Sequence, residues 1–219
     1  MRKAFTVFIF MMIIITLFAS VKVFIVCVSS YGDARILHLP LARKDALNLK
    51  ETLSKIPSAR IDLLENPSFG DLVSEFKKWV KGARSSDTLI FYYAGHGISE
   101  KGEFYFIPAD ADPDDSFTWV PFSRLKKYVP EDVKLVWLID ACYSGSMVKG
   151  RPLRAVRVQK EALEAGAHQV IITSSTGNEI SREMPDGSGG IFTIALAEGL
   201  EGRADINKDG WVKSGELYE

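Results

Sequence analysis

The sequence predicts an α/β protein whose central sheet is mostly parallel and carries helices on both faces. Short apolar runs rich in Val, Ile, Leu and Phe recur along the chain without a clear period of two, as expected for strands buried on both faces. Segments with helical spacing separate them, and this alternation is typical of parallel sheets. The predicted strands are Val21–Val28, Ala59–Leu64, Thr88–Tyr93, Lys134–Ile139 and His168–Thr173.

The predicted helices follow from apolar stripes and a cap signal. A helix in the region of Leu41–Leu53 is indicated by a stripe, and a second follows Ser68, a candidate N-cap. The first stripe consists of Asp45, Leu49, Thr52, Leu53 and Ile56, and the second of Leu72, Phe76, Trp79 and Val80. Pro121–Tyr128 predicts a short helix, Gly190–Glu201 a longer one, and Glu103–Pro108 a small β excursion.

Length and charge restrict the classes of function. With 219 residues, 47% of them hydrophobic and 25% charged, one globular domain is the default. The formal net charge is −1 and the basic residues are dispersed, so we expect no nucleic-acid partner.

The N-terminal segment has the pattern of a targeting sequence. Arg2 and Lys3 precede Ala4–Phe18, an apolar stretch in which only two threonines are polar. A basic start followed by such a stretch predicts a signal peptide or an uncleaved membrane anchor over residues 1–21, and a buried helix is the alternative. A signal peptide or a membrane anchor would place the rest of the chain outside the cytoplasm, either secreted or anchored to the membrane.

Two motifs after strands suggest thiolate chemistry. Tyr93-Ala-Gly-His96-Gly97 and Ile139-Asp-Ala-Cys142-Tyr-Ser-Gly145 each follow a predicted buried strand, and a parallel sheet would carry both to one edge. A His can take the proton of a Cys thiol, and the thiolate is the nucleophile. Taken singly, each residue would more often be a loop His or a packed thiol. In this order and in small-residue settings, they favour catalysis.

These two motifs resemble those of the caspase/metacaspase-like cysteine peptidases, from about Lys22 to the C-terminus. The segment around Cys142 is closer to the metacaspase-type Asp-x-Cys-x-Ser-Gly than to the caspase-type Gln-Ala-Cys-x-Gly. The resemblance implies a caspase-like three-layer sandwich over residues 22–203. It implies Cys142 as nucleophile and His96 as general base, without a third catalytic residue or a cofactor. The backbone N–H groups of Gly97 and Cys142 would bind the oxyanion.

Substrate preference is expected to depend on two acids. Asp140 stands where caspases that cut after Asp carry a Gln, so a carboxylate there should pair with Arg or Lys at P1 of a peptide substrate. The metacaspase pattern places a second acid in the first helix, within an Asn-Asp pair, and here Lys44-Asp45 matches the Asp but not the Asn. Ala94 replaces a Ser that metacaspases tend to have. A structural carboxylate at Asp140 and an exposed one at Asp45 remain alternatives.

The C-terminal segment, residues 204–219, carries an EF-hand-like loop. Asp205 to Glu216 follows the pattern D-x-N-x-D-G-x₅-E, with Gly210 at the turn. The predicted Ca²⁺ ligands are Asp205, Asn207, Asp209, Trp211 through its carbonyl, and Glu216. A single loop without an exiting helix leaves a calcium-free turn as the alternative, and the abrupt end suggests a partial version of a longer protein.

The sequence leaves three hypotheses of function. The first is a cysteine endopeptidase that cuts after Arg or Lys, the second a caspase-fold scaffold with little turnover, and the third an anchored calcium-responsive binding protein. Met147–Lys160 is rich in basic residues and reads as a solvated segment or as a linker that such a peptidase could cut. If Cys142 is the nucleophile, Cys27 has no disulfide partner and should pack in the core.

Overall fold

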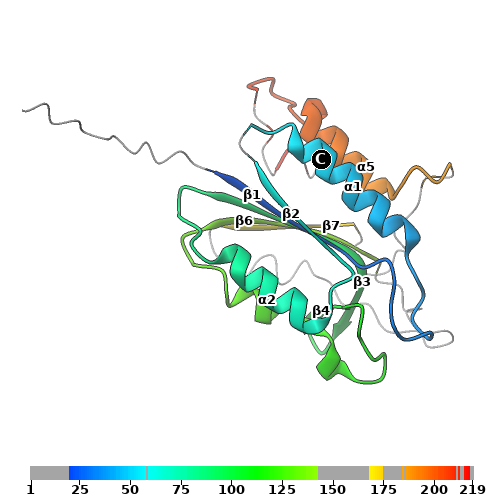
Figure 1. The fold of residues 1–219 in the computed structure, drawn as a ribbon. Coiled ribbons are helices and arrows are strands. Elements are labelled where there is room, and N and C mark those ends of the chain that lie inside the picture. Colours follow the sequence, from blue (N-terminus) through cyan, green and yellow to red (C-terminus); the bar gives the residue numbers. More distant parts are fainter. Residues whose placement is uncertain are drawn as a thin grey trace, which may run out of the picture.

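A computed structural model of the chain describes residues 20–57, 59–142, 168–174, 184, 186–210, 212 and 215–217. Within them, the predicted α/β fold class is confirmed: a seven-stranded sheet carries helices on its two faces (Figure 1). The strands are β1 (Val21–Cys27), β2 (Arg60–Glu65), β3 (Thr88–Glu100), β4 (Glu103–Phe106), β5 (Val120–Pro121), β6 (Lys134–Cys142) and β7 (Gln169–Thr173).

The main part of the sheet is parallel. Its strands lie in the order β2-β1-β3-β6-β7, and each neighbouring pair is parallel. The last residues of β3 continue beyond this region and pair antiparallel with β4, which in turn pairs with β5. The long strand β3 therefore links both parts of the sheet.

Helices form the outer layers. Two helices, α1 and α5, cover one face of the sheet, and α2 and α3 cover the other (Figure 1). The helical segments are α1 (Pro40–Ser54), α2 (Phe69–Val80), η1 (Ser116–Thr118), α3 (Phe122–Lys126), α5 (Ile191–Glu198) and η2 (Gly199–Arg203). None of the described helices is both long and apolar enough to cross a membrane. Residues 1–19, which hold most of the predicted anchor, lie outside the described part.

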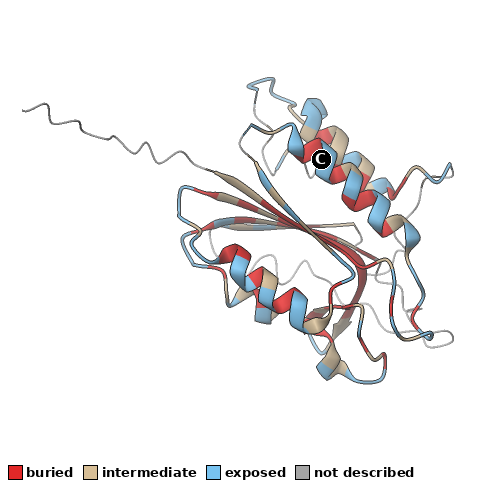
Figure 2. Ribbon diagram, in the orientation of Figure 1, coloured by how far each residue is buried: buried red, intermediate tan, exposed pale blue. Residues whose placement is uncertain are grey.

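Alternation along the central strands builds two separate cores. In β1, Phe24 and Val26 pack toward α2, whereas Val23 and Ile25 pack toward α1. Successive side chains of a strand point to opposite faces, so a strand with helices on both sides is apolar throughout. Figure 2 shows the resulting band of buried residues along the middle of the sheet. Cys27 lies in the α1-side core with 1% exposure, as predicted for a packing residue.

The predicted N-cap at Ser68 is confirmed. Its side chain accepts a hydrogen bond from the backbone N–H of Asp71, which satisfies one of the unpaired donors of the first turn of α2. The helix then buries Leu72, Phe76 and Trp79 against the sheet.

Three element ends differ from the prediction. β3 and β6 run to Glu100 and Cys142, so His96 and Cys142 lie within strands rather than in loops after them. The glycines around His96 suggested a turn, but ladder pairing with β4 and β6 keeps this segment extended. The last predicted helix is α-helical only to Glu198 and continues as a π-helical turn that contains Gly202 at a φ of 107°.

Candidate active site

His96 and Cys142 occupy opposing positions on neighbouring strands. The register of β3 and β6 ends with His96 paired to Cys142, after Ala94 to Asp140. Backbones of paired strands are ~4.8 Å apart, so the fold brings the two residues together, as the motifs predicted. The side chain of Cys142 lies outside the described part of the chain, and its backbone alone defines this juxtaposition.

The imidazole of His96 is buried and oriented by a backbone carbonyl. His96 is 2% exposed, and its Nε2 lies 2.8 Å from the carbonyl oxygen of Leu37. A carbonyl oxygen only accepts hydrogen bonds, so Nε2 must carry the proton. In the neutral ring the lone pair then lies on Nδ1, which becomes the basic nitrogen.

Nδ1 of His96 is buried and has no hydrogen-bond partner among the described residues. Burial lowers the pKa of His96 below its ordinary value of 6.5, and the hydrogen bond to Leu37 opposes this shift by stabilising the charged ring. The ring therefore stays neutral at neutral pH, with a vacant acceptor on Nδ1. That is the state a general base requires.

This pKa direction predicts the acid limb of a pH–rate profile. Activity that requires neutral His96 should be lost as the pH falls, with the kcat/KM midpoint below 6.5 because the pKa of free His96 is lowered. The free energy of unfolding should depend on pH in the same direction. The neutral His96 ring stabilises the fold at pH values above the pKa that His96 has in the unfolded chain, and this stabilisation is lost as the pH falls toward its lower pKa in the folded chain. Initial rates between pH 4.5 and 8 would measure the midpoint. A midpoint above 6.5 would contradict the lowered pKa of His96.

The loop that carries Leu37 lies between β1 and α1 and is fixed at several points. The hydroxyl of Tyr31 accepts a hydrogen bond from the backbone N–H of His96 at 3.0 Å, and the two rings are 5.1 Å apart. Gly32 donates its N–H to the carbonyl of Ala109 at 2.8 Å. The loop is thus bound both to β3 and to the segment after β4.

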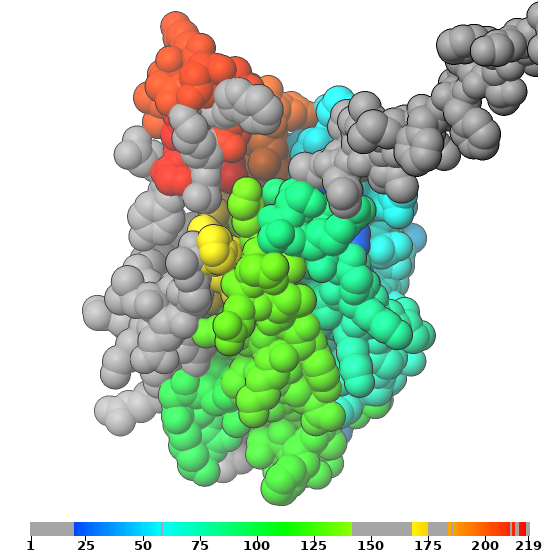
Figure 3. Space-filling model, turned by 90° about the vertical axis from the view of Figure 1, so that its left-hand side faces the viewer, coloured from blue at the N-terminus to red at the C-terminus, as the bar shows by residue number. Residues whose placement is uncertain are grey.

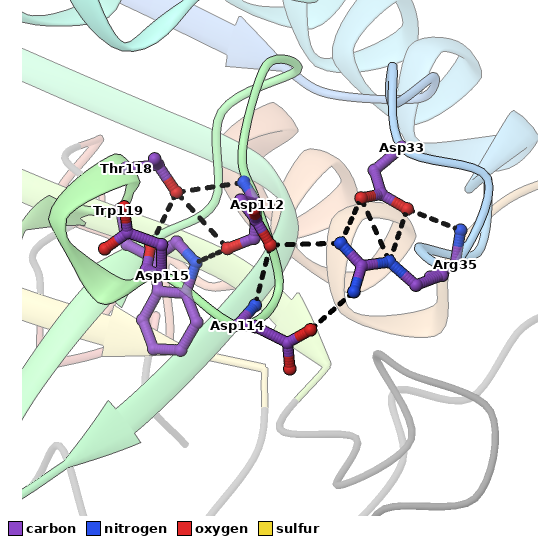
Figure 4. Close-up of polar contacts among 7 residues, drawn as sticks. All are labelled: Asp33, Arg35, Asp112, Asp114, Asp115, Thr118 and Trp119. Carbon is purple, nitrogen blue, oxygen red and sulfur yellow. Dashed lines mark hydrogen bonds and ion pairs between the residues drawn. The ribbon is translucent and has the colours of Figure 1, made fainter.

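Arg35 forms a second link between these segments (Figure 4). Its guanidinium contacts the carboxylates of Asp33 in its own loop and of Asp112 and Asp114 in the segment after β4. The hydrogen bond from Arg35 lowers the pKa of Asp33 to about 2. Single exposed ion pairs contribute little, but this guanidinium bridges two loops with several bonds. The sequence did not point to Arg35 or Leu37. Leu37 acts through its backbone carbonyl, which any residue type has, and the partners of Arg35 in the segment after β4 lie far from it in the sequence.

Gly97 is required by packing. A Cβ at this position would lie 2.6 Å from two ring carbons of Phe104 and 2.9 Å from the Cβ of Ala141. Only glycine fits between β4 and β6 here, which accounts for one glycine of the His motif. The oxyanion role of its N–H stays a prediction.

The two predicted specificity acids come together at the N-terminus of α5. Asp45 on α1 is 5% exposed and accepts a hydrogen bond from the backbone N–H of Gly190 at 2.9 Å. Asp140 on β6 accepts one from the hydroxyl of Thr193 at 2.8 Å. A Cβ on Gly190 would lie 3.1 Å from Asp45 Oδ2 and 3.4 Å from Asp140 Oδ2, so both carboxylates border one point. The alternative of an exposed Asp45 is therefore wrong.

The predicted calcium loop forms a turn stabilised from within. Asp205 accepts hydrogen bonds from the N–H groups of Asp209 at 3.1 Å and Gly210 at 2.9 Å, and Gly210 has a φ of 82°. The described residues contain no group of three or more acidic, His or Cys side chains placed to hold a metal, and Trp211 lies outside them. Glu216 lines a cavity of about 300 Å³ beneath α5, beside Ile172 of β7. Figure 3 shows the C-terminal residues next to β7 on this side.

Comparison with known proteins identifies the family. A family model described as the caspase domain of peptidase C14 matches residues 20–209. The chain belongs to this family. It is therefore a member of the C14 cysteine peptidases, with the resemblance read from its two motifs confirmed.

Individual metacaspases are also similar to this chain, at low sequence identity. Metacaspase-1 of Candida albicans is 27% identical over 165 residues, which cover 64% of this chain and 35% of that protein. Metacaspase-2 of Trypanosoma brucei brucei is 34% identical over 92 residues, covering 36% of this chain and 25% of that protein. This caspase-domain chain thus spans about a third of the length of such relatives, or less.

A solved structure supports the fold. Caspase-1 from Spodoptera frugiperda superimposes with a TM-score of 0.63 at 15% identity, covering 84% of this chain and 69% of that one. At this identity the likeness concerns the fold alone. It confirms the predicted caspase-like arrangement of a central sheet between helical layers.

Proposed function

We propose that this caspase-domain protein is a cysteine endopeptidase that hydrolyses peptide bonds after Arg or Lys. The observation that carries the proposal is His96, which stands opposite Cys142 in the strand register. Its imidazole is buried, Leu37 holds the Nε2 proton, and Nδ1 has no hydrogen-bond partner among the described residues. Family membership supports the peptidase chemistry. The dyad assignment and the preference for basic P1 residues rest on the site itself.

The chemistry needs only groups of this chain. Nδ1 of His96 accepts the thiol proton of Cys142, and the thiolate attacks the scissile carbonyl carbon. The N–H groups of Gly97 and Cys142 stabilise the resulting oxyanion, for which one donor typically contributes ~10²–10³ in rate. The imidazolium then protonates the leaving amine as the C–N bond breaks, which leaves a thioester. Water, deprotonated by the same imidazole, hydrolyses the thioester and restores the thiol.

The two acids supply the preference for a basic residue. Asp45 and Asp140 border one point beside the N-terminus of α5, and Asp140 lies two residues before Cys142 on the same strand. A guanidinium or ammonium group there would meet two carboxylates, whereas an acidic P1 side chain would be repelled. This charge arrangement is the basis of the proposed specificity.

Fluorogenic peptides that differ only at P1 test the function. The full-length chain, kept in mild detergent because of its apolar N-terminal segment, would be assayed on P1 Arg, Lys, citrulline and Asp, with and without Ca²⁺. Much faster cleavage after Arg and Lys than after citrulline, with none after Asp, supports the proposal. Cleavage after Asp would retain the peptidase and overturn the role of the acids, and no cleavage would favour the scaffold hypothesis.

We further propose that the loop Asp205–Glu216 binds Ca²⁺ through Asp205, Asn207, Asp209, the carbonyl of Trp211 and Glu216. Support comes from the pattern and from the turn at Gly210. Millimolar Ca²⁺ should raise the melting temperature of the wild-type chain through linkage. The same ion should leave Glu216→Gln, which lacks the bidentate carboxylate, unchanged. Calorimetry without binding heat at millimolar Ca²⁺ would remove this part and leave the structural turn.

For location, we propose that the N-terminal segment carries the domain across the membrane, either as an anchor or as a cleaved signal. Arg2, Lys3 and the apolar run Ala4–Phe18 support this. Expression with fractionation and N-terminal sequencing distinguishes the forms. An intact N-terminus in the membrane fraction indicates an anchor, a new N-terminus in the soluble extracytoplasmic fraction indicates a signal, and cytoplasmic protein contradicts both.

A further inference from the structure

A buried chain of hydrogen bonds ends on Asp140. The hydroxyl of Tyr92, on β3, lies 2.7 Å from the hydroxyl of Thr193, on α5. The Thr193 hydroxyl lies 2.8 Å from Oδ2 of Asp140, on β6. Tyr92 and Thr193 are both 0% exposed, whereas Asp140 is only partly buried. Two inaccessible hydroxyls, one from β3 and one from α5, thus lead to the carboxylate on β6 that is assigned to P1 recognition.

The direction of this chain follows from counting protons. An ionised carboxylate only accepts hydrogen bonds, so the single proton of Thr193 must be donated to Asp140. The Thr193 oxygen is then an acceptor, and the Tyr92 hydroxyl must donate to it. Burial and the nearby charge of Asp140 raise the pKa of Tyr92 well above its ordinary value, so the phenol keeps the proton it donates.

The same helix end also holds the second acid. The backbone N–H of Gly190, immediately before α5, donates to Asp45. Lys44, next to Asp45 on α1, donates to the carbonyl of Gly187 at 2.7 Å. The N-terminal end of α5 is therefore bound to α1 and β6 at once. The position of each carboxylate depends on where this end lies.

We propose that Thr193, itself held by Tyr92, is the positioning residue that sets the direction of the Asp140 carboxylate toward a basic P1 side chain. The inference rests on the proposed specificity for Arg and Lys. Charge-assisted hydrogen bonds fix geometry as well as energy. Without the donor at 193, Asp140 keeps its charge but loses the hydrogen bond that ties its Oδ2 to α5. Recognition of a cationic P1 group should weaken, while the chemistry at Cys142 stays intact.

Three substitutions separate this role from a structural one. Thr193→Val removes the donor at similar size, Thr193→Ser keeps it, and Tyr92→Phe removes the outer bond alone. Each is made in the full-length chain, and kcat/KM is measured on a P1 Arg peptide and on its neutral citrulline twin. Binding of both peptides, labelled with fluorescein, is measured separately by anisotropy on Cys142→Ala chains with the same second substitutions.

The expected result is selective for charge. Thr193→Val should lower kcat/KM and binding for P1 Arg by ~10–100-fold, the usual range for a hydrogen bond to a charged group, without changing the citrulline values. Thr193→Ser should stay near wild type, and Tyr92→Phe should fall between them. The rate of Cys142 alkylation by iodoacetamide should be equal in all four proteins.

The outcomes that overturn the proposal are distinct from failure of the peptidase. Equal loss for Arg and citrulline peptides, or slowed alkylation of Cys142, would make Thr193 a structural residue. Unchanged binding of the P1 Arg peptide in Thr193→Val would also overturn it. So would a wild-type site that binds the P1 Arg peptide no more tightly than the citrulline peptide. If the wild type hydrolyses neither peptide, the proposed function fails. The anisotropy measurement then still decides the role of Thr193.

Discussion

Replacing Cys142 by alanine should abolish hydrolysis of every peptide, because the thioester needs a thiol and the other cysteine, Cys27, is buried in the core. Replacing His96 by alanine should lower kcat by ~10²–10⁴, the usual contribution of a positioned general base. Both follow from the register of β3 and β6, in which His96 and Cys142 form the last pair. The measurement is initial rate on a P1 Arg peptide, with circular dichroism to verify that each variant is folded.

Cys27 provides the matched control. It is 1% exposed, and burial together with the nearby charge of Glu65 raises its pKa to about 12, so it carries no thiolate near neutral pH. Cys27→Ala should therefore retain activity and still incorporate one iodoacetamide, whereas Cys142→Ala should incorporate none. Retained hydrolysis in Cys142→Ala, or lost labelling in Cys27→Ala, would show that Cys142 is not the nucleophile.

Replacing Asp140 by asparagine should remove most of the preference for basic P1 residues. Loss of one partner of a desolvated charge pair costs about 2–5 kcal/mol, which corresponds to roughly 30- to 4,000-fold in kcat/KM for a P1 Arg peptide. The amide oxygen of asparagine still accepts the Thr193 hydrogen bond, so the packing of α5 is preserved. The citrulline peptide should be cleaved at nearly the wild-type rate.

The companion substitution Asp45→Asn should act in the same direction. Its amide oxygen can still accept from the N–H of Gly190, which separates loss of charge from loss of the helix contact. Ratios of kcat/KM for Arg over citrulline compare both variants with the wild type. An unchanged ratio in Asp140→Asn would contradict the S1 assignment, whatever happens to the absolute rate.

Long apolar strands and strong helix signals were predictable, whereas element ends near the site were not. β1, β2 and β7 lie within a residue or two of their predicted ranges, and Ser68 caps α2 as expected. β3 was predicted to stop before His96 because the adjacent glycines indicate a turn. Pairing with β4 keeps it extended to Glu100, and the local sequence does not indicate which strands will pair.

The sequence by itself determined the fold class, the family and the residue types at the site. Buried strands, helical stripes and the motifs around His96 and Cys142 are local, so they can be read along the chain. Only the tertiary structure decided that Asp45 and Asp140 border one point, and that Leu37 sets the tautomer of His96. It alone places Thr193 between Tyr92 and Asp140. These contacts join elements distant in sequence, and backbone carbonyls or hydroxyls leave no periodic signal from which such pairing could be predicted.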